Sequence, residues 1–190
     1  EVFEIASLPP CVPGMRLNNK LVVTAKNERV DYVLGSKVTG CTVADGKVVS
    51  VTVGTAGAGK EIKADAIVLA GGGFESGALK LDSHGHLHET ILDLPVTMPE
   101  GVKEEDLIHG DYWGFPQPLF LCGVEVDETM LVTYQGKPVH SNVYAAGGVI
   151  AGATRWQEKS GEGIALGSAI KAADAILSSV RAGVATKERN

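Results

Sequence analysis

The clearest periodicity in the chain lies near its carboxyl end, where apolar residues recur with the spacing of a helix. Residues 164–180 carry apolar side chains at positions i, i+4, i+7, i+11 and i+14, namely Leu166, Ile170, Ala173, Leu177 and Val180. This spacing places them on one stripe of an α-helix. Ser160 is a candidate N-cap for this helix. Gly161, Gly163 and Gly167 would let its first turns approach another element closely.

A second, weaker stripe stands near the amino end, directly after Pro13-Gly14. Its apolar members are Met15, Leu17, Leu21 and Val22. The pattern predicts a helix that ends around Lys26 and Asn27, where polar residues begin.

The next segments are rich in valine and threonine and predict strands rather than helices. A short strand is expected at residues 32–34, and two longer ones at Lys37–Ala44 and residues 47–53. Asp45-Gly46 separates the longer two, and both residues of such a turn must take positive φ. The sequence therefore predicts a β-hairpin here.

Two short apolar runs each end in glycines. Ile67–Leu69 leads into Ala70-Gly71-Gly72-Gly73 and is expected to be a strand buried on both faces of a parallel sheet. Val143–Ala145 is expected to be a second strand, ending at Gly147-Gly148. Residues 124–133 predict strand and turn, and residues 135–138 predict a turn. The interval 75–120 is irregular and rich in proline, histidine and acidic residues, which suggests an inserted cap or substrate-side region.

Composition narrows the classes of protein that fit. The 190 residues are 44% hydrophobic, enough to bury a core, and the formal net charge of −6 argues against a nucleic-acid partner. No apolar run is expected to reach transmembrane length. Cys11, Cys41 and Cys122 form no C-x-x-C pair, so we expect reduced thiols and no metal or iron–sulfur site held by this chain alone. The chain begins at Glu1 and enters a proline-rich stretch, as expected of a piece of a longer protein.

The glycine turns are the best candidates for chemistry. A turn without Cβ atoms lets backbone approach a bulky cofactor, and a helix start offers unpaired N–H groups to a phosphate or to the electron-rich edge of a reduced flavin. Close helix–sheet packing is the alternative explanation. The candidate contact residues are Gly71, Gly72, Gly73, Phe74, Gly147, Gly148, Gly161, Glu162, Gly163 and Ile164.

Other motifs are weaker. Gly54 to Lys60 fits the start of a P-loop, but Glu61 follows where serine or threonine is needed, and the next segment predicts a strand. His84, His86 and His88 alternate and would share one face of a strand, although a solvated loop is favoured over a metal site. Residues 112–118 are aromatic and proline-rich and fit either a pocket wall or a cap core. Arg155 fits an anion-binding role or a surface position.

Taken together, these segments resemble two-domain flavoproteins related to fumarate reductase. In that family, a strand ending in glycines and a late N-x-Y-A-A-G segment bracket a cap, and the final helix begins G-x-G-x-A. Here the matching segments are Ala70 to Gly73, Asn142 to Gly147, and Gly161 to Ala165. The order and spacing of residues 8–17, 66–79, 110–118, 123–129 and 142–165 are most similar to the B subunits of anaerobic glycerol-3-phosphate dehydrogenases. The G-x-G-x-x-G unit of such flavoproteins is absent from the chain.

The resemblance implies an α/β fold: a partial Rossmann-like flavin-binding domain with a β-hairpin layer and an inserted cap region. Residues 1–74 and 121–190 would form the flavin-binding domain, without its N-terminal βαβ unit, and 75–120 the cap. The implied cofactor is flavin, as FMN or FAD. The implied activity is oxidation of sn-glycerol 3-phosphate to dihydroxyacetone phosphate, with electrons passed to quinone in anaerobic respiration.

The resemblance also implies partners and a location. A catalytic flavoprotein subunit and an iron–sulfur, membrane-anchoring subunit would hold the protein on the cytoplasmic side of the inner membrane. The fragment alone is expected to be inactive, and the sequence identifies no catalytic acid or base. Two further interpretations stay open: an independent flavin reductase of the fumarate-reductase kind, which would draw on the three histidines and Arg155, and a non-catalytic assembly subunit.

Overall fold

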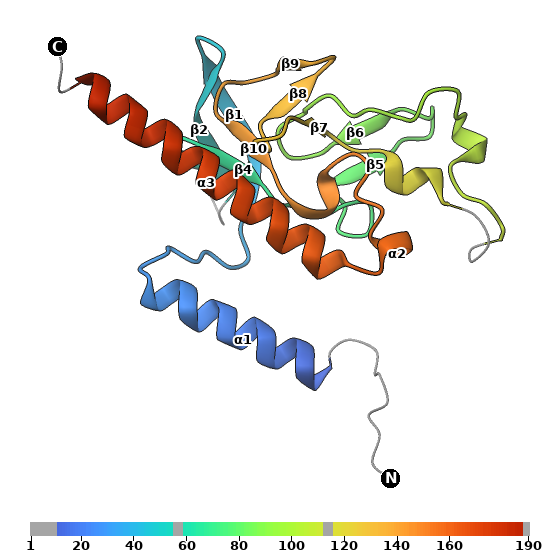
Figure 1. The fold of residues 1–190 in the computed structure, drawn as a ribbon, viewed down its shortest axis with the longest axis horizontal. Coiled ribbons are helices and arrows are strands. Elements are labelled where there is room, and N and C mark those ends of the chain that lie inside the picture. The colour runs from blue at the N-terminus through green and yellow to red at the C-terminus, as the bar shows by residue number, and fades with distance from the viewer. Residues whose placement is uncertain (1–10, 55–58, 112–115, 188–190) are drawn as a thin grey trace. The chain divides into compact units, whose positions relative to one another are not determined.

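The structure is a computed structural model that describes residues 11–54, 59–111 and 116–187 (Figure 1). The chain divides into two compact units, Glu1–Ser36 and Lys37–Asn190. The first unit contains helix α1 (Val12–Asn27), which confirms the predicted amino-terminal helix. Cys11 caps it, with Sγ accepting a hydrogen bond from the Gly14 N–H at 3.4 Å. The strand expected at residues 32–34 is wrong: these residues are exposed and pair with no other strand, and β-propensity needs a pairing partner to act.

The second unit begins with an antiparallel sheet of order β1-β2-β3. Its strands are β1 (Lys37–Ala44), β2 (Lys47–Gly54) and β3 (Lys60–Lys63). Asp45 and Gly46 take φ values of 49° and 72°, so the predicted hairpin is confirmed. The strand β3 begins directly at Lys60, which confirms that no helix follows the P-loop-like stretch; residues 55–58 of that stretch lie outside the described part of the chain.

A parallel pair forms the centre of this unit. Strand β4 (Ile67–Leu69) pairs with β10 (Val143–Ala145), with Tyr144 opposite Val68. Both predicted strands are confirmed, but the expectation that β4 is buried on both faces is wrong. Val68 is 41% exposed, because nothing in the described part of the chain fully covers its face of β4.

Smaller elements surround this pair. They are the hairpin of β5 (Leu79–Leu81) and β6 (Leu87–Glu89), the sheet of β7 (Glu125–Val126), β8 (Val132–Tyr134) and β9 (Lys137–Pro138), the 3-10 turns η1 (Glu104–Asp106), η2 (Pro118–Leu121) and η3 (Gly147–Val149), and the short helix α2 (Arg155–Glu158). The hydrophobic core joins Val48 of β2, Leu69 of β4, Leu79 of β5 and Val143 of β10. The assignment of residues 75–120 to a cap stays a prediction.

The long helix α3 (Gly161–Lys187) runs along β10 and η3 (Figure 1). The predicted helix is confirmed, but its large apolar stripe faces outward: Leu166, Ile170, Leu177 and Val180 are exposed, while Ser168 and Ala172 are buried. Small residues allow the close approach to β10, so they take the inner face. By length and composition alone, Gly161–Arg181 would suffice to cross a membrane. The expectation that no segment reaches that length is therefore wrong.

One buried amide joins the hairpin layer to the parallel pair. Asn142, directly before β10, accepts a hydrogen bond from the Val48 N–H at 2.9 Å through Oδ1. Its Nδ2 donates to the carbonyls of Val48 at 2.8 Å and Asp65 at 3.0 Å. Asn142 is 6% exposed and Val48 is fully buried, so the two Val48 groups would find little water in the absence of the amide. Asn142 therefore fixes where β10 starts relative to β2.

We predict that Asn142→Ala lowers the free energy of unfolding by ~2–4 kcal/mol, because it leaves the two buried backbone groups of Val48 without this partner. Urea unfolding followed by circular dichroism measures the change. Asn142→Asp keeps the acceptor, loses both donors and should also be destabilised. An Asn142→Ala protein as stable as the wild type would contradict the assignment.

Candidate functional site

The two glycine corners lie side by side because they end neighbouring parallel strands. A Cβ built on Gly73 would lie 3.0 Å from the Gly148 carbonyl oxygen, and one built on Gly148 would lie 3.4 Å from the Gly73 nitrogen. Parallel strands place their carboxyl ends at one edge of a sheet, the edge at which open α/β sheets bind ligands. The structure thus brings together two segments predicted separately from the sequence.

The remaining glycines of the first corner serve its own turn. Gly72 takes a φ of 83°, and a Cβ there would clash with Ser76. The Ser76 hydroxyl is within hydrogen-bond distance of the carbonyls of Gly71 at 2.6 Å and Gly73 at 3.0 Å. Gly71 faces Ile91, away from the second corner. The Phe74 side chain packs against the hydrophobic core, which leaves its backbone as the part available to a cofactor.

The start of α3 joins the second corner. Gly147 takes a φ of 75°, and a Cβ there would lie 3.8 Å from the Cβ of Ala165. The Gly147 N–H donates to the Ser168 hydroxyl at 2.9 Å. The first N–H groups of an α-helix have no partner inside the helix and carry positive partial charge. Glu162 and Gly163, in this first turn, are exposed, so their backbone is accessible to a ligand.

The guanidinium of Arg155 occupies the space beside the two corners, here called the notch. This group lies against Gly148 and 3.4 Å from the Cβ position of Gly73, and the Arg155 Cβ is 3.7 Å from that of Gly161. It forms an ion pair with Glu75, and its Cζ lies 5.6 Å from the centre of the Phe120 ring. The side chain of Arg155 is only 27% exposed. The interpretation of Arg155 as a surface residue is therefore wrong.

The electrostatics of this pair favour the ionised state. Burial raises the pKa of Glu75, but the hydrogen bond to Arg155, a hydrogen bond to the Glu75 backbone and the charge of Arg155 together lower it below the ordinary value. Sequence reasoning missed the roles of Glu75 and Phe120. Glu75 follows the first corner by two residues, which was the one available signal, whereas nothing local marks Phe120.

The three histidines gather around an aspartate. His88 Nε2 lies 3.0 Å from Asp82 Oδ2, and His86 Nδ1 lies 3.5 Å from the same oxygen. Backbone N–H groups of His86 and then the His88 side chain hold the pKa of Asp82 well below its usual range. Across the described residues, no group of three or more His, Cys, Asp or Glu side chains has the geometry to hold a metal ion. Burial raises the pKa of the Cys122 thiol to about 11, so this thiol stays protonated.

The aromatic segment is only partly visible, because residues 112–115 lie outside the described part. Its buried member Gln117 accepts a hydrogen bond from the His109 N–H at 2.7 Å.

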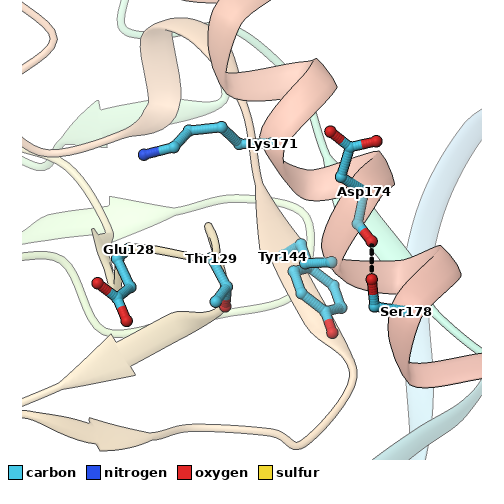
Figure 2. A pocket seen from close by; sticks show the side chains of 7 residues that line it. Glu128, Thr129, Tyr144, Lys171, Asp174 and Ser178 are labelled. Atoms are coloured by element: carbon cyan, nitrogen blue, oxygen red, sulfur yellow. Dashed lines mark hydrogen bonds between the residues drawn. The ribbon is translucent and has the colours of Figure 1, made fainter. Parts of the chain in front are cut away.

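A separate groove of about 510 Å³ lies between α3 and β10. It is lined by Glu128, Thr129, Tyr144, Lys171, Asp174, Ala175 and Ser178. Figure 2 shows Lys171 extending toward the turn that carries Glu128 and Thr129. None of the glycines of the two corners lines it.

Comparison with known proteins identifies the family of this chain. The family model described as "FAD binding domain" matches residues 1–164. The chain is 29% identical over 184 residues to the B subunit of anaerobic glycerol-3-phosphate dehydrogenase from Actinobacillus pleuropneumoniae, covering 92% of this chain and 41% of that protein. It is 29% identical over 180 residues to the corresponding B subunit from Haemophilus influenzae, covering 93% of this chain and 40% of that protein.

A protein of Halobacterium salinarum, named as a probable B subunit of the same dehydrogenase, is 30% identical over 177 residues, covering 92% of this chain and 40% of that protein. The chain thus spans about two fifths of the length of these relatives. No solved structure gives a significant match. The resemblance inferred from the sequence is confirmed, and the mixture of helices and strands agrees with an α/β fold, whereas its Rossmann-like detail stays a prediction. The chain belongs to the FAD binding domain family of flavoproteins, whose cofactor is flavin.

Proposed function

We propose that the two glycine corners and the first turn of α3 form the part of the flavin site that this chain contributes. The single observation that carries this proposal is the contact between Gly73 and Gly148, which brings two turns without Cβ atoms together at the carboxyl edge of the β4–β10 pair. The proposed contacts come from Gly71, Gly72, Gly73, Phe74, Gly147, Gly148, Gly161, Glu162, Gly163 and Ile164.

The residues present fit a flavin. A side chain at either Gly73 or Gly148 would collide with the other corner or with Arg155. Glycine at both positions lets the corners meet while the Gly148 backbone stays only half-buried. The exposed first turn of α3 offers N–H groups and positive partial charge, which suit an electron-rich ring edge or a phosphate. A bound flavin supplies the redox chemistry, while the protein binds and orients it.

Arg155 gives this site its second feature, a cation held against both corners. A guanidinium binds carboxylates and phosphates in the same planar geometry. Glu75 occupies it in this structure, and its side chain is 60% exposed, so an incoming anion can take its place without breaking the core. We therefore assign Arg155 the role of binding the anionic group of the substrate.

The relatives' names extend the proposal to a whole protein. We infer that the polypeptide carrying this chain is a flavin-dependent subunit of an anaerobic glycerol-3-phosphate dehydrogenase, oxidising sn-glycerol 3-phosphate to dihydroxyacetone phosphate with electrons passed to quinone. Its partners would be a catalytic flavoprotein subunit and an iron–sulfur subunit at the inner membrane. The names of the relatives and the anion-binding chemistry of Arg155 support this inference.

We predict that the protein takes up FAD or FMN and that Gly148→Ala weakens flavin binding about tenfold or more, equivalent to ~1.4 kcal/mol. The added Cβ would occupy the place of the Arg155 guanidinium and displace it from the two corners. Titration followed by flavin absorbance measures the affinity. Gly40→Ala is the matched control, because a Cβ at Gly40 meets open space. A wild-type protein without flavin uptake would instead support a non-catalytic assembly subunit.

We further predict that Arg155→Ala in the intact protein raises KM for glycerol 3-phosphate about tenfold, consistent with the ~1.5–3 kcal/mol of a hydrogen bond to a charged group. Glu75→Gln removes the competing carboxylate charge and should leave KM unchanged or lower it. Steady-state kinetics gives both values. A fall in kcat with an unchanged KM would assign Arg155 a structural role, and turnover of carboxylate substrates alone would favour a reductase of the fumarate-reductase kind.

A further inference from the structure

A single hydroxyl joins α3 to the second glycine corner. Ser168 is 9% exposed and lies two turns after the start of the helix. Its Oγ accepts a hydrogen bond from the Gly147 N–H at 2.9 Å and donates to the Ile164 carbonyl at 2.6 Å. The same atom therefore contacts the corner after β10 and the first turn of α3, the two elements that the proposed flavin site requires together.

The geometry of the corner explains why Gly147 needs this partner. The preceding Ala146 N–H still donates to the Leu69 carbonyl, which extends the β4–β10 ladder by one bond. Gly147 then takes a φ of 75° and turns its N–H out of the ladder, although the residue is buried. A buried N–H without an acceptor is unfavourable. The Ser168 hydroxyl supplies that acceptor from a neighbouring element.

The other two serines of α3 make no such connection. Ser178 donates to the Asp174 carbonyl at 2.8 Å, as Figure 2 shows, and Ser179 donates to the Ile176 carbonyl at 2.8 Å. Both serines are exposed, and these bonds stay within the helix. Ser178 thus shares with Ser168 a bond to the carbonyl four residues earlier, but it lacks the bond to a second element.

We propose that Ser168 is a positioning residue for the flavin, setting how closely the first turn of α3 approaches the Gly147 corner. This inference rests on the proposed flavin site. The positive partial charge at a helix start acts only over about the first turn, so a small displacement of α3 changes the potential at a ligand held there. A reduced flavin carries more negative charge than an oxidised one and is stabilised more strongly by this partial charge.

The test compares Ser168→Ala, Ser168→Thr and Ser178→Ala in the flavin-loaded protein and in the protein without flavin. We expect Ser168→Ala to weaken binding of reduced relative to oxidised flavin about tenfold, which lowers a two-electron midpoint potential by about 30 mV. Amide hydrogen exchange at Gly147 should become at least tenfold faster, with or without flavin. Ser168→Thr, which keeps the hydroxyl, should restore both values, and Ser178→Ala should change neither.

Each contrary result has a distinct meaning. Faster exchange at Gly147 with an unchanged potential would overturn the positioning role and leave the flavin site standing. Unchanged exchange, or equal effects of alanine and threonine at position 168, would show that the hydroxyl bond is not responsible and would overturn the inference. Failure of the wild type to take up flavin would overturn the proposed function itself, and it would be seen before any Ser168 variant is compared.

Discussion

The parallel pairing of β4 with β10 is the constraint on which the rest of the site depends. The two strands are far apart in sequence, yet their register places Ala145 opposite Leu69. Both chain segments therefore turn away at the same edge, and the two glycine corners meet there. Without this pairing, the glycines would be ordinary loop residues. With it, they meet at one point, and the Arg155 guanidinium lies against them there.

The notch is shaped by charge as well as by the absence of side chains. Arg155 packs into the space that Gly148 leaves, and it connects Glu75 and Phe120, the two ends of the interval predicted to form the cap. The Arg155 guanidinium can bind either the carboxylate of Glu75 or the anionic group of a ligand. Two buried side chains fix the elements around the notch. Ser168 of α3 bonds to the Gly147 backbone, and Asn142, directly before β10, bonds to the Val48 backbone of β2.

The sequence predicted those elements that interactions between neighbouring residues determine. The Asp45-Gly46 hairpin follows from the φ values that its turn requires, and the corners follow from glycines after short apolar runs. The inner face of α3 could not be predicted, because the helix is apolar on both sides and packing against β10 selects the small residues Ser168 and Ala172. The contact between Arg155 and Glu75 could not be predicted either, because the two residues are 80 positions apart and only the parallel pairing of β4 with β10 brings them together.

The central claim is that the notch between Gly73 and Gly148 faces the flavin ring. A crystal structure of the intact protein with bound flavin tests it most directly. Our account predicts the ring in van der Waals contact with the backbone of both glycines, with the first turn of α3 pointing at its edge and Arg155 beside it. A flavin bound elsewhere, with the Arg155 guanidinium still filling a closed notch, would contradict the account.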